Sequence, residues 1–207
     1  MDSWITIVTS LVALLTAVLL PLLFRRSRKQ QAGRSAELLG HLRSLGVDVS
    51  PAQAGDARER IGLGYASGQK SEGLIDVADR TIDSANVISI TSQYGTRYFI
   101  DYHVKSPNIL GERELKKTVL TRQRDRPVVG RVTGIRWKGD PSLTQSLSFD
   151  YSLEDRLLTA GGKVATGRVG IFPERRFGYT RIRTDYSLPP AEVFQALCSI
   201  ARHIRAW

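Results

Sequence analysis

An uncharged apolar run near the N-terminus is the clearest pattern in this chain. Residues 4–24 read WITIVTSLVALLTAVLLPLLF and include no charged residue. A helix of this length, at about 1.5 Å per residue, extends about 31 Å and crosses the hydrocarbon core of a bilayer. A backbone in lipid must satisfy its own hydrogen bonds, so the run predicts a transmembrane helix over 4–24.

The charges on either side of this run predict its orientation. Asp2 precedes the run. Four basic residues follow it: Arg25, Arg26, Arg28 and Lys29. A cleaved signal peptide has the opposite arrangement, with positive charge before the apolar segment and small residues at a cleavage site after it. Because positive residues stay on the cytoplasmic side, we expect a signal-anchor in the cell membrane, with the N-terminus outside and residues 25–207 in the cytoplasm.

Two smaller features of this region suggest membrane partners. Thr9, Ala13 and Ala17 recur at four-residue spacing, which allows two membrane helices to approach closely and predicts a homodimer face. The basic residues of the linker 25–34 suit anionic lipid headgroups, although a stop-transfer role explains them as well.

The pattern after the linker predicts one domain over residues 35–207, beginning with helices. Ser35 is a suitable helix cap, leucines follow at positions 38, 42 and 45, and Gly46 ends the segment. A second short helix is expected at 56–66, followed by a polar loop at 68–73. Residues 74–84 fit either a helix or the beginning of a strand.

From about residue 86 the pattern becomes that of a sheet. Residues 87–91 are mostly β-branched, residues 97–105 alternate, and a turn at 93–96 separates them, which predicts a hairpin. Further strands are expected at 116–122, 129–138, 145–152, 164–172 and 178–186, together with a hairpin over 157–164 that turns at a Gly-Gly pair.

The last segment predicts a helix that packs on this sheet. Pro189 and Pro190 suit the first turn of a helix, and Glu192 favours the positive end of its dipole. An apolar stripe follows at helical spacing: Val193, Leu197, Ile200 and Ile204. The expected class is therefore α+β, with a mostly antiparallel sheet and helices at the two ends of the domain.

Composition adds charge and redox information. The chain has 207 residues and a net charge of +10, and residues 25–34 carry five of the positive charges, so the remaining domain is also basic. A basic surface can meet anionic lipid, nucleic acid or an acidic partner, or it can simply be solvated. The only cysteine, Cys198, excludes an internal disulfide and is most simply a small buried residue.

The tempting catalytic and metal motifs fail on spacing. The segment 62–71 is glycine-rich, but Gln69 separates Gly68 from Lys70, whereas a P-loop has its lysine directly after the second glycine. None of the three histidines pairs with another histidine or cysteine at metal-ligand spacing. We therefore expect no metal, no cofactor and no identifiable catalytic residue.

Arginines in the predicted sheet are the most distinctive chemical feature. The candidate anion-binding residues are Arg122, Arg124, Arg131, Arg136, Lys138, Arg181 and Arg183. Trp137, Phe177 and Tyr179 lie among them, and basic residues mixed with aromatic ones can hold phosphates and stack bases. The alternative is a solvated face that is partly neutralised by nearby acidic residues.

These observations leave three functional hypotheses. The first is a non-enzymatic binding or assembly module at the cytoplasmic membrane face, because the sequence has no catalytic constellation. The second is a membrane-tethered enzyme or binder acting on an anionic ligand, such as a lipid headgroup or a phosphorylated compound. The third, less favoured, is a tether for nucleic acid.

Overall fold

The computed structural model describes residues 33–53, 68–79, 81–106, 109, 116–126, 132–159 and 168–206. Several predicted features lie outside these residues: the span 4–24 with its small residues Thr9, Ala13 and Ala17, the basic residues Arg25, Arg26, Arg28 and Lys29, the helix 56–66, and the Gly-Gly turn. None of the helices in the described ranges combines the length and the apolar character that a bilayer-spanning segment needs.

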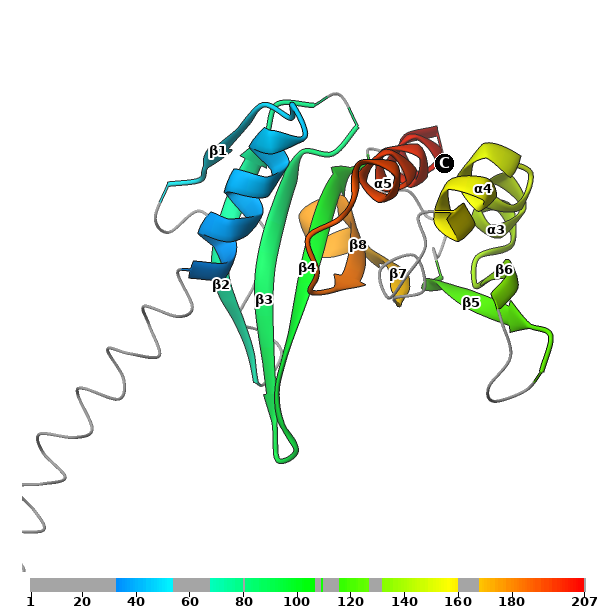
Figure 1. Ribbon diagram of the computed structural model, residues 1–207, viewed down its shortest axis with the longest axis horizontal. Helices are drawn as coiled ribbons and strands as arrows, with labels where there is room; N and C mark the ends of the chain where they lie inside the picture. Colours follow the sequence, from blue (N-terminus) through cyan, green and yellow to red (C-terminus); the bar gives the residue numbers. More distant parts are fainter. Residues whose placement is uncertain are drawn as a thin grey trace, which may run out of the picture.

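The described residues contain an eight-stranded antiparallel sheet with the order β1-β2-β3-β4-β8-β7-β5-β6 (Figure 1). The strands are β1 (Val49–Pro51), β2 (Gln69–Val77), β3 (Ser84–Ser92), β4 (Gly95–Lys105), β5 (Thr118–Arg124), β6 (Val132–Lys138), β7 (Val169–Glu174) and β8 (Tyr179–Asp185). The expected α+β class, with its antiparallel sheet, is confirmed.

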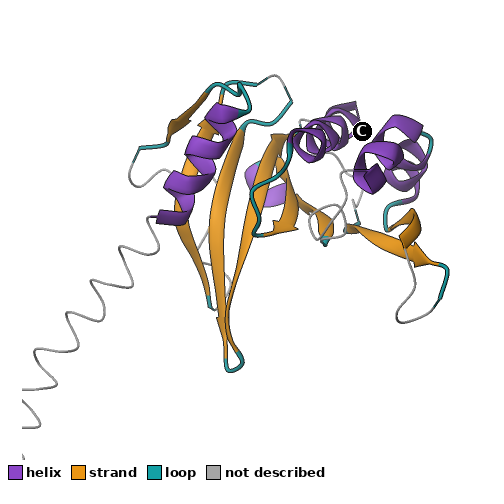
Figure 2. Ribbon diagram, in the orientation of Figure 1, coloured by secondary structure: helices purple, strands orange, loops and turns teal. Residues whose placement is uncertain are grey.

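The helices pack on one face of this sheet. They are a helix over 33–44, α3 (Pro141–Ser148), α4 (Tyr151–Thr159) and α5 (Ala191–Ala206), and they follow one another along the sheet (Figure 2). Their buried side chains join those of alternate strand residues in one apolar core, for example Leu38, Tyr102, Leu147, Ile182 and Leu197. The opposite face of the sheet, which we call the second face, carries the residues in between.

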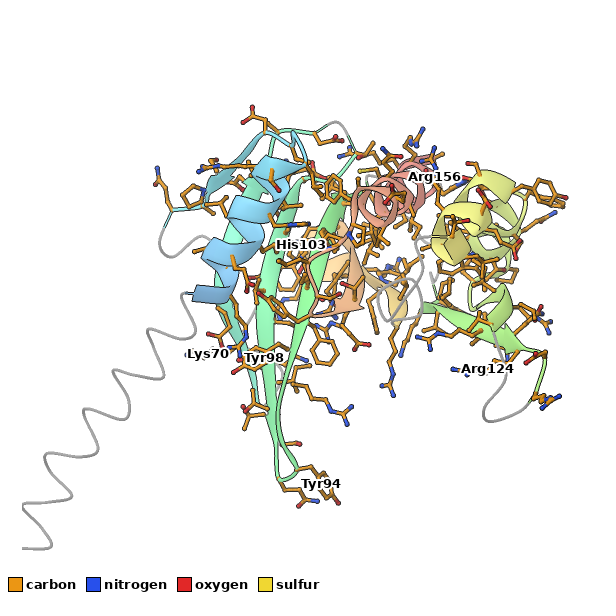
Figure 3. All side chains as sticks on the ribbon, in the orientation of Figure 1. Lys70, Tyr94, Tyr98, His103, Arg124 and Arg156 are labelled. Carbon is orange, nitrogen blue, oxygen red and sulfur yellow. The ribbon has the colours of Figure 1, made fainter. Side chains whose placement is uncertain are left out.

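The C-terminal helix α5 forms as predicted. It begins directly after Pro190, and Val193, Leu197, Ile200 and Ile204 are all buried against the sheet and the neighbouring helices. The β3–β4 hairpin is also confirmed. Its pairing runs from Ser84 opposite His103 to Ser92 opposite Gly95, and the exposed Tyr94 lies at its tip (Figure 3).

The region 141–159 is helical, so the predictions of a strand at 145–152 and of a hairpin beginning at 157 are wrong. Asp140 caps α3 by accepting hydrogen bonds from the backbone N–H groups of Ser142 and Leu143, and Pro141 occupies the first turn. Helical spacing buries four leucines of α3 and α4 in the core: Leu143, Leu147, Leu153 and Leu157. The helices therefore also lie between strands in the chain and are not confined to the two ends of the domain.

Two further predictions need correction near the N-terminal end. Residues 69–77 form strand β2, where a loop was expected at 68–73, and residues 74–77 take the strand alternative. A register shift between Ser71 and Gly73 interrupts the pairing of β2 with β3, which weakens the alternation that identifies a strand. The first helix already includes residues 33 and 34, so Ser35 is not its cap, whereas Gly46 does follow its last turn with φ +79°.

The sheet opens between β5 and β7. Only Thr118 and Val119 of β5 pair with β7 among the described residues, and the β5–β6 hairpin then diverges from β7 (Figure 1). Gly139, just after β6, permits this arrangement because a Cβ there would lie 2.3 Å from the carbonyl oxygen of Lys117. The backbone N–H of Asp140 then donates to Thr118 Oγ1 at 3.1 Å, which holds the beginning of α3 against β5.

Candidate functional site

A buried carboxylate lies at the centre of the second face. Asp101 of β4 stands opposite Arg183 of β8 and is 0% exposed. Arg183 donates from Nε to Asp101 Oδ1 at 2.7 Å and from Nη2 to Oδ2 at 2.8 Å, and Arg181 donates from Nη1 to Oδ2 at 3.3 Å. Arg181 also pairs with Glu174 at 2.5 Å. Two arginines thus share one buried carboxylate, which fixes both guanidinium groups.

One aromatic ring gathers three cations beside this carboxylate. Lys117 Nζ lies 4.7 Å from the ring centre of Phe172, and the guanidinium carbons of Arg181 and Arg183 lie at 5.1 and 5.6 Å. The ring rests over Gly170, where a Cβ would lie only 2.6 Å from the Cε2 atom of Phe172. Cations are attracted to aromatic faces, so the ring helps to keep these positive groups together.

A pocket of about 320 Å³ opens here, where β5 separates from β7. We call it the cation pocket. The residues that give it its character are Phe99, Lys117, Arg168, Phe172, Arg183 and Asp185. Within the described residues, no ion pair joins Lys117 or Arg168 to a carboxylate. Arg183 uses two of its five N–H donors on Asp101. The wall therefore has an excess of positive charge and can hold an anion.

The structure places the seven predicted anion-binding residues in different parts of the domain or outside the described residues. Arg181 and Arg183 lie at the Asp101 cluster, and Arg136 and Lys138 alternate with the core residue Trp137, so they also belong to the second face. Arg122 stands opposite Ile135, whose side chain packs on the core, and it therefore belongs to the helix side.

The two remaining predicted residues do not join the cluster. Arg124 is exposed at the end of β5, away from the second-face cluster (Figure 3), and Arg131 lies outside the described residues.

The aromatic residues expected beside the arginines are mostly inside the fold. Trp137 is 5% exposed and Tyr179 is 6% exposed, and Phe177, in the short helix η2 (Arg175–Phe177), packs against Leu74 and Tyr179. Base stacking requires an accessible ring. The geometry of these rings therefore supports packing within the protein more than stacking on a nucleic acid.

His103 is buried beside the arginine cluster. It stands opposite Arg181, its Nδ1 lies 3.0 Å from Ser84 Oγ, and its ring meets Tyr179 edge to face at 4.9 Å. Burial lowers the pKa of His103 to about 4, and the nearby Arg181 and Arg183 act in the same direction against the carboxylate of Asp101. His103 is therefore a neutral packing residue at neutral pH.

A second polar cluster joins α3, α4 and α5, and sequence reasoning did not find it. Ser146 Oγ lies 2.7 Å from His203 Nδ1, and His203 Nε2 lies 3.0 Å from Asp150 Oδ2. This order resembles a Ser-His-Asp triad, but Asp150 also accepts from the backbone N–H of Leu153 as the cap of α4. Burial raises the pKa of Asp150, but these hydrogen bonds outweigh it and lower the pKa to about 2.

Ser146, Asp150 and His203 are not among the described residues that line the cation pocket or a second pocket next to it. We interpret the cluster as a tie between helices.

The most informative site residues were also missed in the sequence. Asp101 and His103 alternate with Ile100 and Tyr102, which is the pattern of a strand with one solvated face. Lys117 lies about 50 residues before Arg168 and Phe172 in the chain, and no motif links it to them. Asp101 lies between Ile100 and Tyr102, and a charged residue within this largely apolar run was the available signal for a buried ion pair.

No protein-family model, curated protein or solved structure matches this chain.

Replacing Asp101 tests the buried ion pairs. Asp101→Ala leaves two arginines without their shared partner, and we expect the free energy of unfolding to fall by about 3–5 kcal/mol. Asp83→Ala is the control, because Asp83 also pairs with an arginine, Arg205, but both are partly exposed. Its expected loss is about 1 kcal/mol. Chemical denaturation of the full chain measures both, and equal losses would contradict a special role for Asp101.

The pKa of His103 predicts a pH dependence of stability. Below pH 6.5 the unfolded chain binds a proton that the folded chain excludes until about pH 4. The contribution of His103 to the free energy of unfolding is therefore fully present above pH 6.5, and it falls by about 3 kcal/mol as the pH drops to 4. His103→Gln should flatten the unfolding free energy across this window. Parallel profiles for the two proteins would show that His103 does not carry the effect.

Proposed function

We propose that this chain is a single-pass membrane protein whose domain is a non-enzymatic binding or assembly module on the cytoplasmic side, and that the module holds an anionic group in the cation pocket. The wall of that pocket supports the proposal most directly. Lys117, Arg168 and Arg183 line it together, and Arg183 is held in place by the buried Asp101. Positive groups that are fixed before binding lose less freedom when an anion arrives.

The beginning of the domain supports a site close to the membrane. The guanidinium of Arg34 lies 3.7 Å from the ring centre of Tyr98, and the Tyr186 hydroxyl oxygen lies 3.2 Å from the carbonyl oxygen of Arg34. These contacts hold the last residue of the basic linker 25–34 on the domain. Ten residues reach at most about 35 Å whatever their conformation, so the predicted span would keep the domain near the bilayer.

The chemistry of the pocket favours binding over catalysis. The described residues that line it include no histidine, cysteine or serine, which are the side chains that most often serve as nucleophile or proton carrier. The buried His103 is not among them. Asp185 is the carboxylate among these lining residues, and its Oδ2 accepts from the backbone N–H of Arg168 at 3.2 Å. The rest of the described wall is mainly basic and aromatic, and such groups stabilise an anion.

Anion binding is tested with methyl phosphate and the full chain in phosphatidylcholine nanodiscs, followed by ³¹P NMR. We expect saturable binding that weakens as salt is added, since charge attraction carries it. Lys117→Ala and Arg168→Ala should each weaken the affinity about fivefold, or about 1 kcal/mol. The control is Arg97→Ala, an exposed arginine of β4 that lines neither pocket. The proposal fails if methyl phosphate does not bind or if the control loses as much.

A further inference from the structure

A second pocket adjoins the cation pocket on the helix side of the sheet. It has a volume of about 270 Å³, and we call it the apolar pocket. Its wall is largely apolar and is formed by Tyr102, Leu157, Val169, Pro189, Val193 and Leu197. The residues that line both pockets are Arg168, Val169, Thr184 and Asp185. The two pockets therefore meet at the end of the β7–β8 pair, one basic and one apolar.

The wall of the apolar pocket contains an unsatisfied polar atom. The hydroxyl of Tyr102 is buried and has no hydrogen-bond partner among the described residues, and burial raises its pKa. Buried hydroxyl groups normally have a partner. A site that places such a group among apolar side chains suits a ligand that is mostly hydrocarbon with few polar atoms.

The apolar pocket also lies where the membrane linker joins the domain. Tyr186 lines this pocket, and its hydroxyl donates to Glu37 Oε2 at 2.7 Å and lies 3.2 Å from the carbonyl oxygen of Arg34. Arg34 ends the basic linker 25–34, ten residues from the end of the predicted span. A molecule that leaves the bilayer beside the anchor would therefore meet this side of the domain.

From this arrangement we infer that the two pockets bind one anionic membrane lipid. Its head lies against Lys117, Arg168 and Arg183 in the cation pocket, and one hydrocarbon chain lies in the apolar pocket. The small volume of the apolar pocket suits one chain. This inference rests on the proposed function, since it assigns a ligand to the same anion site.

The test compares methyl, butyl and hexyl phosphate on the full chain in phosphatidylcholine nanodiscs, with empty nanodiscs as the reference. We expect the affinity to rise by about a factor of four for each methylene that enters the apolar pocket. Hexanol, which lacks the anionic head, should bind far more weakly than hexyl phosphate. Affinity that stays constant from methyl to hexyl phosphate overturns the inference, while methyl phosphate binding keeps the proposed function. Absence of all phosphate binding overturns both.

A substitution that fills the apolar pocket provides a matched variant for this test. Val193→Phe places a ring in the apolar pocket and should remove the gain with chain length while leaving the affinity for methyl phosphate unchanged. Val193→Met is a milder second variant if the first does not fold, with a partial loss expected. The control is Val132→Phe, because Val132 is a half-buried valine of β6 that lines neither pocket. If the affinity rises equally from methyl to hexyl phosphate in Val193→Phe and in the control, the inference is contradicted.

The source of the phosphate is decided by competition. We expect a single-chain phosphatidic acid, added to the nanodiscs, to displace hexyl phosphate at a lower concentration than inorganic phosphate does. If inorganic phosphate displaces hexyl phosphate as effectively as this lipid, the ligand is a free phosphate compound and the lipid assignment is wrong.

Discussion

The buried carboxylate of Asp101 is the constraint on which the second face depends. It neutralises Arg183 and contributes to neutralising Arg181, and both arginines lie in a strand whose other face is part of the apolar core. A slip of one residue between β4 and β8 would place Asp101 and Arg183 on opposite faces and would move Ile182 out of the core. Removing one partner of a buried ion pair costs more free energy than forming the pair gains. The pair between Asp101 and Arg183 therefore contributes mainly by fixing the register of the strands.

This register also builds the pocket. Once Arg183 stands opposite Asp101, it also stands opposite Gly170 of β7, where the missing side chain leaves space for Phe172. Gly170 in turn stands opposite Val119, at the last pairing before β5 and β7 separate in the described residues. The charged cluster and the opening of the sheet therefore coincide, and Lys117 reaches the ring of Phe172 from the opposite side of the gap.

The sequence was a good guide wherever local periodicity and burial agree. The apolar stripe of α5 predicted the buried position of Leu197 correctly, and the alternation over residues 97–105 predicted strand β4. The helices α3 and α4 were missed although Asp140-Pro141 is a recognisable helix start and the leucines that follow have helical spacing. Phe149 and Tyr151, which favour strands, obscure this signal.

The site was less predictable because partners distant in the chain create it. Arg181 and Arg183 were identified by residue type, but nothing local shows that their partner is Asp101, some 80 residues earlier. Alternation placed Asp101 on the polar face of β4, and polar faces are usually solvated. Only the pairing of β4 with β8, and of β8 with β7, shows that this face is buried and that Lys117 and Arg168 share its pocket.

We propose that this basic domain is tethered at the cytoplasmic face of a membrane, where an anionic lipid can reach its two pockets. Protease access to a tag at the C-terminus, compared in intact cells and in cells whose membrane has been opened, tests that claim most directly. We expect a protected tag in intact cells and digestion after the membrane is opened. Digestion in intact cells would place the domain outside, contradict the orientation inferred from Arg25, Arg26, Arg28 and Lys29, and move the site away from the inner leaflet.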